Sequence, residues 1–269
     1  STPYVFEITG LLKGNNKITL VSDNSYPGLP HDDIVYSSAA TDETQTNWNG
    51  ILGYIRLREE AENYIESMHV YPHGDLIDIN VTVSLSGQSG QPDKLVIQSE
   101  VMEQMEFRIG MKESLSSDTV QTSYNHGNKI HMLFKNIKLH ANVRKWDEYE
   151  GNLYTLKVTL YTQTAITDSK EVTLGIRTFG YNEKGRFTLN NRCIFIRSEA
   201  NCAEFPEEGH PPMDVESWMN ILSRYQEYGI NYMRFHSHCP PDAAFTAADR
   251  LGILMQPELS HWNPKDALE

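Results

Sequence analysis

The hydrophobic pattern divides the chain into a long first part rich in short alternating runs and a shorter last part in which strands alternate with helices. Alternation of apolar and polar residues over four to ten positions is typical of half-buried β-strands. Strands are expected at residues 4–9, 17–22, 51–57, 76–86, 94–100, 119–123, 130–138, 153–161 and 171–175. Turn-rich segments separate these runs, so the first part of the chain is expected to be all-β.

Two β-domains are expected from the spacing of these runs. Roughly six or seven strands over about 110 residues is the profile of an immunoglobulin-like β-sandwich, which we assign to residues 66–176. Residues 1–65 are expected to form a separate β-domain before it. A hairpin with the two-residue turn Asn190-Asn191 follows, because asparagine tolerates the positive φ that such turns need.

The last part, residues 177–269, is expected to be α/β. Asp214 is the expected N-cap of a helix that ends before Gly229. A second helix opens at Pro241–Asp242 and ends at Gly252. Strands are expected at 194–197, 230–235 and 253–255. Such closely spaced strand–helix–strand units form right-handed parallel crossovers, in which ligand-binding groups lie just past the carboxyl ends of the strands.

Four side chains with chemical potential fall at that edge: Arg234, His236, His238 and Glu258. Imidazole, thiolate and carboxylate are zinc ligands, so the two histidines with Cys239 and Glu258 permit a metal site as an alternative. Glu258 could also pair with Glu199 or Glu204 as a catalytic carboxyl dyad.

Composition narrows the possible partners. The formal net charge of −13 and the lack of a Lys/Arg cluster argue against nucleic acid, which needs a basic face. No apolar run reaches the length of a membrane span, and no signal peptide is visible. The three cysteines lack CxxC spacing and do not indicate a disulfide framework.

Five segments, in order along the chain, resemble glycoside hydrolase family 2. They are Trp48-Asn-Gly-Ile-Leu-Gly-Tyr-Ile-Arg-Leu, Trp146-Asp147 with Leu153-Tyr154, Gly175-Ile-Arg-Thr-Phe with Phe187-Thr-Leu-Asn, Gly229-Ile-Asn-Tyr-Met-Arg, and Ser237-His-Cys-Pro with Ala248-Asp-Arg-Leu-Gly-Ile. The resemblance implies that residues 1–65 are the C-terminal part of a jelly-roll domain, that 66–176 are the immunoglobulin-like sandwich, and that 177–269 hold strands one to three of a (β/α)8 TIM barrel.

The resemblance also implies the activity. The family hydrolyses O-glycosidic bonds with retention, using two carboxyl groups, and needs no cofactor. Both family glutamates would lie beyond Glu269, so we expect a truncated and inactive piece of an exo-β-glycosidase, most simply of β-galactosidase type and secreted or periplasmic. The alternative is a non-catalytic carbohydrate-binding or scaffold module. The exposed edge of a cut barrel would favour homo-oligomers.

By resemblance, six residues bind the sugar or support the site: Arg234, His238, His236, Glu258, Asn201 and Trp262. Arg234 occupies the position of an arginine that keeps a carboxylate ionised. His236 and His238 compete for the family's sugar-binding histidine, with His238 ahead. Asn201 substitutes for contacts of the loop after the first barrel strand, and Glu258 braces the site.

Overall fold

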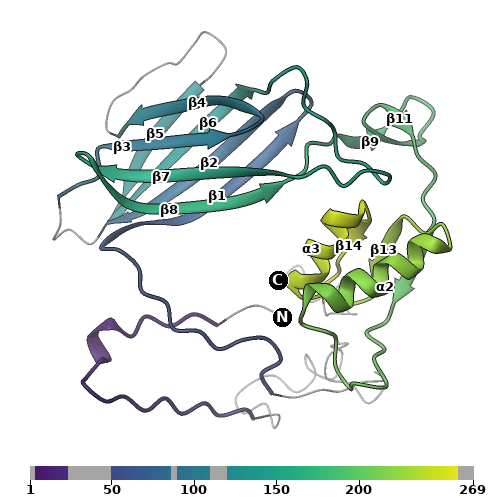
Figure 1. Cartoon of the computed structure of the whole chain (residues 1–269), viewed down its shortest axis with the longest axis horizontal. Coiled ribbons are helices and arrows are strands. Elements are labelled where there is room, and N and C mark those ends of the chain that lie inside the picture. The colour runs from purple at the N-terminus through teal and green to yellow at the C-terminus, as the bar shows by residue number, and fades with distance from the viewer. Residues whose placement is uncertain (1–3, 24–49, 86–89, 110–119, 260–269) are drawn as a thin grey trace, which may run out of the picture. The chain divides into compact units, whose positions relative to one another are not determined.

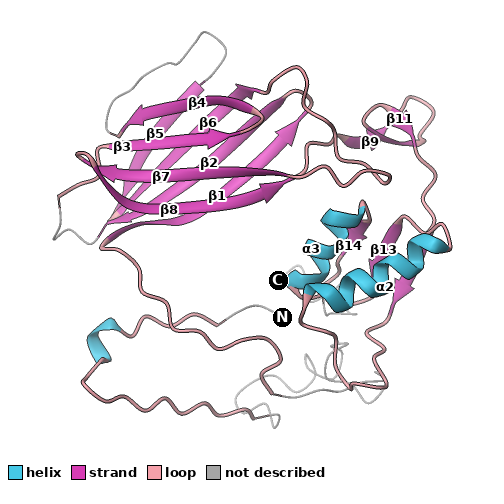
Figure 2. Cartoon of the chain, viewed as in Figure 1, coloured by secondary structure: helices cyan, strands magenta, loops and turns pink. Residues whose placement is uncertain are grey.

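The computed structural model describes residues 4–23, 50–85, 90–109 and 120–259 (Figure 1; Figure 2). Residues 56–195 form one compact unit, and residues 196–269 belong with residues 1–55 in a second. None of the helices in the described ranges is both long enough and apolar enough to cross a membrane.

The first unit contains a sandwich of two four-stranded antiparallel sheets, with strand orders β1-β2-β6-β5 and β4-β3-β7-β8. The strands are β1 (Asn63–His73), β2 (Leu76–Leu85), β3 (Lys94–Ser99), β4 (Met102–Arg108), β5 (Val120–His126), β6 (Lys129–Lys138), β7 (Tyr154–Thr162) and β8 (Ala165–Leu174). The expected β-sandwich between residues 66 and 176 is therefore present, and six of its strands lie where alternation predicted strands.

Alternation along the chain did not indicate β1 or β4, and it gave only the last part of β8. A bulge between Ile65 and Ser67 breaks the period of two in β1. β4 buries only Met102 and Phe107, which lie five positions apart. The first part of β8 has mostly exposed or half-exposed side chains. Edge strands of this kind contribute few side chains to the core and so leave a weak signal.

The core of the sandwich is filled by the inward side chains of both sheets. Phe107 and Phe134 meet at its centre, with ring centroids 4.3 Å apart. At one side the sheets are closed by polar side chains of β8: Asp168 accepts a hydrogen bond from the Ile65 N–H at 2.7 Å, and Lys170 Nζ donates to the carbonyls of Ile65 and Glu66 at 2.9 Å. Figure 1 shows β1 and β8 side by side there. These bonds satisfy part of the unpaired backbone of β1.

A small three-stranded sheet follows, made of β9 (Phe179–Tyr181), β10 (Phe187–Leu189) and β11 (Arg192–Cys193). The predicted turn is confirmed: Asn190 and Asn191 have φ of 52° and 65° and connect β10 to β11. Asn190 Nδ2 also donates to the Trp146 carbonyl at 2.9 Å, and Arg192 bonds Glu148 at 2.6 Å. The hairpin is thus tied to the sandwich loop that carries Trp146.

The second unit contains a three-stranded parallel sheet of order β12-β13-β14 with two helices. Its elements are β12 (Ser198–Asn201), α2 (Val215–Glu227), β13 (Tyr232–Phe235), α3 (Asp242–Leu251) and β14 (Leu254–Gln256). The expected caps are present: Asp214 Oδ1 accepts from the Ser217 N–H at 2.8 Å, and Gly252 ends α3 with φ 81°. The parallel strand–helix–strand order is as predicted.

The first parallel strand was predicted at 194–197, and this placement is wrong by four residues. The Ile194 N–H donates to the Phe187 carbonyl, so Ile194 belongs to the preceding hairpin. Asn231 binds Arg197 through both its backbone and its side chain, and pairing with β13 proper starts at Ser198. The prediction favoured residues 194–197 because Ile194 to Ile196 are apolar. The strand that forms, β12, is polar, and its side chains are exposed or half-exposed.

The strands predicted at 4–9, 17–22 and 51–57 are also wrong. The described residues before β1 contain one 3-10 helix, η1 (Thr9–Leu11), and otherwise no helix or strand. Val5 and Ile18 are 85% and 65% exposed. An alternating segment becomes a strand only when another strand satisfies its backbone, and the described residues supply none here. The jelly-roll assignment of residues 1–65 stays a prediction.

Candidate functional site

The two faces of the parallel sheet differ in chemistry. Met233 and Phe235 of β13 are fully buried in a core with Trp218 and Leu222 of α2. Because side chains alternate along a strand, Tyr232 and Arg234 point to the opposite face. That face is partly exposed and polar. Within the described residues, helices therefore cover one face of the sheet, and the other face is polar and partly exposed.

At the carboxyl edge of this polar face, Glu258 is held by two donors. Arg234 Nε donates to Oε1 at 2.6 Å, and the Ser237 backbone N–H donates to Oε2 at 2.8 Å. The Ser237 hydrogen bond first, and the Arg234 guanidinium second, lower the pKa of Glu258 below its ordinary value. Glu258 is therefore ionised at neutral pH and fixed in place by both oxygens.

The donated bond of Ser237 depends on an uncommon backbone conformation. Ser237 has φ of 56°, in the left-handed region, and its side chain is buried. The Glu258 N–H in turn donates to the His238 carbonyl at 3.1 Å. The loop after β13 and the segment after β14 are thus joined by reciprocal hydrogen bonds.

Two further polar side chains extend this network along the face. Tyr232 donates its hydroxyl to Gln256 Oε1 at 2.9 Å, and Gln256 Nε2 donates to Glu258 Oε1 at 3.3 Å. Neither was predicted as a site residue. The period of two could have identified them, because Tyr232 and Arg234 share a face of β13 and Gln256 follows the register of Arg234 in β14.

The two candidate histidines occupy different environments. His238 is half-buried, packs edge-on against Phe235 with ring centroids 5.4 Å apart, and donates from Nδ1 to the His236 carbonyl at 3.1 Å. Burial lowers the pKa of His238, so it is neutral at neutral pH. His236 is exposed.

Asn201 ends β12 beside these histidines. Its carbonyl accepts from the His236 N–H at 2.9 Å, while its side chain Oδ1 accepts from the Ala203 N–H at 3.0 Å. The side-chain oxygen therefore caps its own loop. The sixth predicted residue, Trp262, lies outside the described residues.

Glu258 and Glu199 do not form a carboxyl dyad. Glu199 pairs in register with Met233, so its side chain lies on the helix-covered face, opposite to Glu258. Its Oε2 is buried without a hydrogen-bond partner. Burial and the charge of Glu204 raise the pKa of Glu199. Glu204 itself is exposed on the loop after β12.

The zinc alternative gains no support from the geometry. Within the described residues, no three His, Cys, Asp or Glu side chains are placed to share a metal ion. Cys239 directs its thiol to the Pro240 carbonyl at 3.7 Å, not towards a histidine ring. Cys202, by contrast, lies 3.8 Å from Nδ1 of His236.

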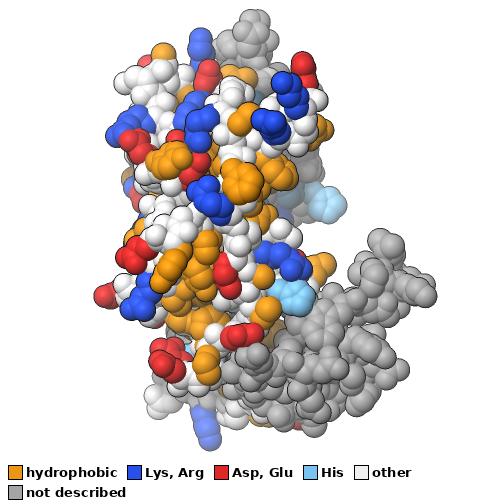
Figure 3. Space-filling view, turned by 90° about the vertical axis from the view of Figure 1, so that its right-hand side faces the viewer, with side chains coloured by type: hydrophobic (Ala, Val, Ile, Leu, Met, Phe, Trp, Pro, Cys, Tyr) orange, Lys and Arg blue, Asp and Glu red, His pale blue; other side chains and the backbone are white. Residues whose placement is uncertain are grey.

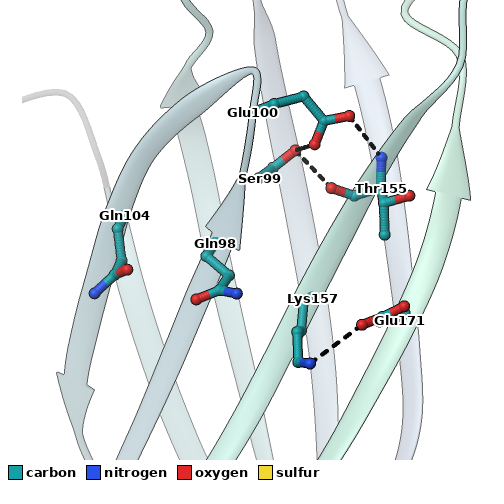
Figure 4. A pocket seen from close by; sticks show the side chains of 7 residues that line it. All are labelled: Gln98, Ser99, Glu100, Gln104, Thr155, Lys157 and Glu171. Carbon is teal, nitrogen blue, oxygen red and sulfur yellow. Dashed lines mark hydrogen bonds and ion pairs between the residues drawn. The ribbon is translucent and has the colours of Figure 1, made fainter.

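A shallow depression lies on the outer surface of the sandwich (Figure 4). It is lined by Gln98, Ser99, Glu100, Gln104, Thr155, Lys157 and Glu171. Lys157 pairs with Glu171 at 3.2 Å, and Glu100 accepts from the Thr155 N–H at 3.2 Å. Its three charged groups therefore all have partners within the depression, and no aromatic ring is among the lining residues.

On the face drawn in Figure 3, basic and acidic side chains lie interspersed with hydrophobic ones. The described residues of that face therefore form no broad surface of one charge.

Comparisons with known proteins agree with the β-sandwich. The sequence model described as Glycosyl hydrolases family 2 matches residues 63–177, which span β1 to just beyond β8. A putative beta-glucuronidase of Formosa agariphila is 27% identical over 95% of this chain and 29% of its own length. A beta-galactosidase of Thermoanaerobacter pseudethanolicus is 24% identical over 97% of this chain and 33% of its own length. The chain thus spans about a third or less of these curated relatives.

Solved structures share the fold at low identity. The beta-glucuronidase of Parabacteroides merdae, solved with glycerol in its active site, aligns with a TM-score of 0.57 and 15% identity, covering 74% of this chain and 24% of that one. A family 2 glycosyl hydrolase of Bacteroides cellulosilyticus aligns with a TM-score of 0.52 and 12% identity, covering 74% of this chain and 27% of its own. Taken with the match over residues 63–177, these findings show that the sandwich of this chain is similar to that of glycosyl hydrolases family 2.

Proposed function

We propose that this chain supplies the immunoglobulin-like sandwich and the first strands of the catalytic (β/α)8 barrel of a retaining exo-β-glycosidase. The family match over residues 63–177 and the names of the similar proteins support a β-glycosidase. The parallel sheet β12-β13-β14, with helices on one face, supports the barrel assignment, because a barrel is built from such units. Polar residues gather past the carboxyl ends of its strands, where barrel enzymes bind substrate.

The observation that carries this proposal is the pair formed by Arg234 and Glu258. Glu258 holds the guanidinium through Nε alone. An arginine has five N–H donors, and within the described residues the two terminal amino groups of Arg234 make no hydrogen bond. They can therefore bind a second carboxylate or the hydroxyls of a sugar. Arg234 is thus a positioning residue oriented in advance by Glu258.

The described residues do not supply a retaining mechanism by themselves. Retention needs two carboxyl groups about 5 to 5.5 Å apart, one of them free to attack the anomeric carbon. Both oxygens of Glu258 are already bonded, and Glu199 lies on the other face of the sheet. We propose that this chain contributes substrate contacts and support, and that it does not turn over glycosides alone.

The substrate class in this proposal is a β-linked O-glycoside. The sequence favoured a galactoside, while the two relatives bear the names beta-glucuronidase and beta-galactosidase. His238 is held by its hydrogen bond to the His236 carbonyl and by its contact with Phe235, and its lowered pKa favours the neutral imidazole, which suits a hydrogen bond to a sugar hydroxyl. His236, Asn201 and Trp262 remain proposed secondary contacts. Self-association through the outer strands of the parallel sheet also remains a proposal.

The test compares the 269-residue chain with the natural gene product that contains it, on p-nitrophenyl β-D-galactoside, β-D-glucuronide and β-D-mannoside. We expect hydrolysis of one of these by the gene product and none by the chain alone. In the gene product, Arg234→Gln should lower kcat by about 100-fold, because an oriented charge near the reacting carboxylate is lost.

Arg224→Gln, at an exposed position in the last turn of α2, is the matched control and should leave kcat unchanged. Hydrolysis by the 269-residue chain would refute its proposed inactivity. A gene product inactive on all three sugars, and on further aryl β-glycosides, would favour the non-catalytic carbohydrate-binding module instead.

A further inference from the structure

Two loops at the carboxyl edge of the parallel sheet bring a thiol and an imidazole together. Cys202 directly follows β12, and His236 directly follows β13. The hydrogen bond from the His236 N–H to the Asn201 carbonyl, 2.9 Å long, ties the two loops together. Cys202 Sγ consequently lies 3.8 Å from Nδ1 of His236, and both residues are exposed.

The other two cysteines serve as internal comparisons, because all three are reduced and exposed. Cys193 Sγ accepts a hydrogen bond from Asn182 Nδ2 at 3.4 Å. Cys239 donates to the Pro240 carbonyl at 3.7 Å. Among the three, Cys202 alone contacts an imidazole nitrogen. The three thiols therefore share their exposure and differ in whether a base lies beside them.

We propose that Cys202 is a thiol-modification site that forms a mixed disulfide with low-molecular-weight disulfides, with His236 as the proton acceptor. The thiolate is the reactive form of cysteine, and a neutral imidazole in contact with a thiol can take its proton. The inference rests on these two residues and is independent of the proposed glycosidase function.

The reaction balances as a thiol–disulfide exchange. The Cys202 thiol transfers its proton to Nδ1 of His236, and the resulting thiolate attacks one sulfur of the small disulfide. A new S–S bond forms as the old one breaks. The second sulfur leaves with the bonding electron pair and takes up the proton. Cys202 is oxidised to the disulfide level, and one small thiol is released.

The experiment treats the folded 269-residue chain with oxidised glutathione and follows each cysteine separately by peptide mass spectrometry. At neutral pH we expect Cys202 to react about tenfold faster than Cys193 or Cys239, because an imidazole nitrogen 3.8 Å from its thiol can accept the proton as the thiol attacks. His236→Gln should reduce the Cys202 rate to that of the other two while leaving their rates unchanged.

A second measurement needs no variant. The rate advantage of Cys202 over Cys193 in the unaltered chain should shrink as the pH rises and every thiol ionises without help. Unchanged circular dichroism of His236→Gln verifies its fold, and should that variant misfold, the pH series on the unaltered chain decides. Equal rates for the three thiols, or a Cys202 advantage that does not change with pH, would overturn the proposal.

Discussion

The sandwich and the parallel sheet bury their apolar surface in different ways. In the sandwich each sheet covers the inner face of the other, so both inner faces are buried in the core. In the α/β part, α2 and α3 cover one face of the sheet, and the other face carries Arg234, Tyr232 and Gln256. The difference shows where a functional site can form: a sheet face that is not buried in a core can hold oriented polar groups.

The largest expected effect sharpens the packing side of this comparison. Phe134→Ala removes a fully buried ring at the centre of the sandwich and should lower its free energy of unfolding by about 3–5 kcal/mol. Denaturant unfolding, with hydrogen exchange to assign the affected peptides, measures it. Tyr71→Ala, at an exposed position of the same sheet, should change stability by less than about 1 kcal/mol. Similar losses for both variants would show that Phe134 is not a core residue.

The second prediction contrasts the two faces of one strand. Met233→Ala opens a cavity on the helix-covered face and should lower the free energy of unfolding by about 2–5 kcal/mol. Tyr232→Phe, the neighbouring residue on the polar face, loses only the hydroxyl bond to Gln256 and should cost roughly 1 kcal/mol. Hydrogen-exchange protection of peptides from α2 and α3 measures both. A larger loss of stability for Tyr232→Phe than for Met233→Ala would contradict the assignment of Met233 to the packed face and Tyr232 to the polar face.

The third prediction uses pH to test the polar face. Because the folded-state pKa of Glu258 is depressed, its contribution to stability is present above the unfolded-state pKa and is lost as pH falls through the folded value. Glu258→Gln should therefore be less stable than the unaltered chain near neutral pH, and the difference should disappear in acid. Thermal unfolding between about pH 6.5 and pH 3 measures this.

Glu227→Gln is the control for that series, since Glu227 is an exposed carboxylate at the end of α2. Its difference from the unaltered chain should vary little over the same range. A Glu258→Gln difference that persists unchanged into acid would mean that the ion pair and the Ser237 bond do not stabilise the charged form.

The smallest expected effect has the opposite sign and lies on the covered face. Burial raises the pKa of Glu199, so the folded state penalises its charge once pH exceeds the unfolded-state value. Glu199→Gln should raise the melting temperature slightly near neutral pH and leave it unchanged in acid. Glu207→Gln, at an exposed position, should have no effect at either pH. A destabilised Glu199→Gln at neutral pH would contradict the assignment.

Much of the fold could be predicted because its signals are local. Alternation located six sandwich strands, Asp214 and Gly252 marked helix ends through their caps, and the Asn190-Asn191 turn needed only residues that tolerate positive φ. The reason for a glycine at position 175 can be seen only in the folded structure. A Cβ there would lie 3.0 Å from the Trp146 side chain, so the close approach explains the glycine.

The site was predicted less completely than the fold. The sequence brought Arg234, the histidines and Glu258 to one edge because parallel strands end together. It could not show that Glu258 takes a hydrogen bond from the Ser237 backbone, since backbone donors are the same at every position and their direction depends on φ. The orientation of Asn201 towards its own loop and the contact of Cys202 with His236 were likewise absent from any local pattern.

By itself, then, the amino-acid sequence determined the class of each well-patterned segment, the parallel order of the last strands and the family resemblance. These depend on side-chain periodicity and on residues with special backbone preferences, which act over a few positions. Tertiary structure alone decided where β12 begins, which strands at the sheet edges form, and which atoms contact Glu258 and Cys202. Those outcomes depend on hydrogen-bond partners that lie far away in the chain, and a partner exists only once the chain has folded.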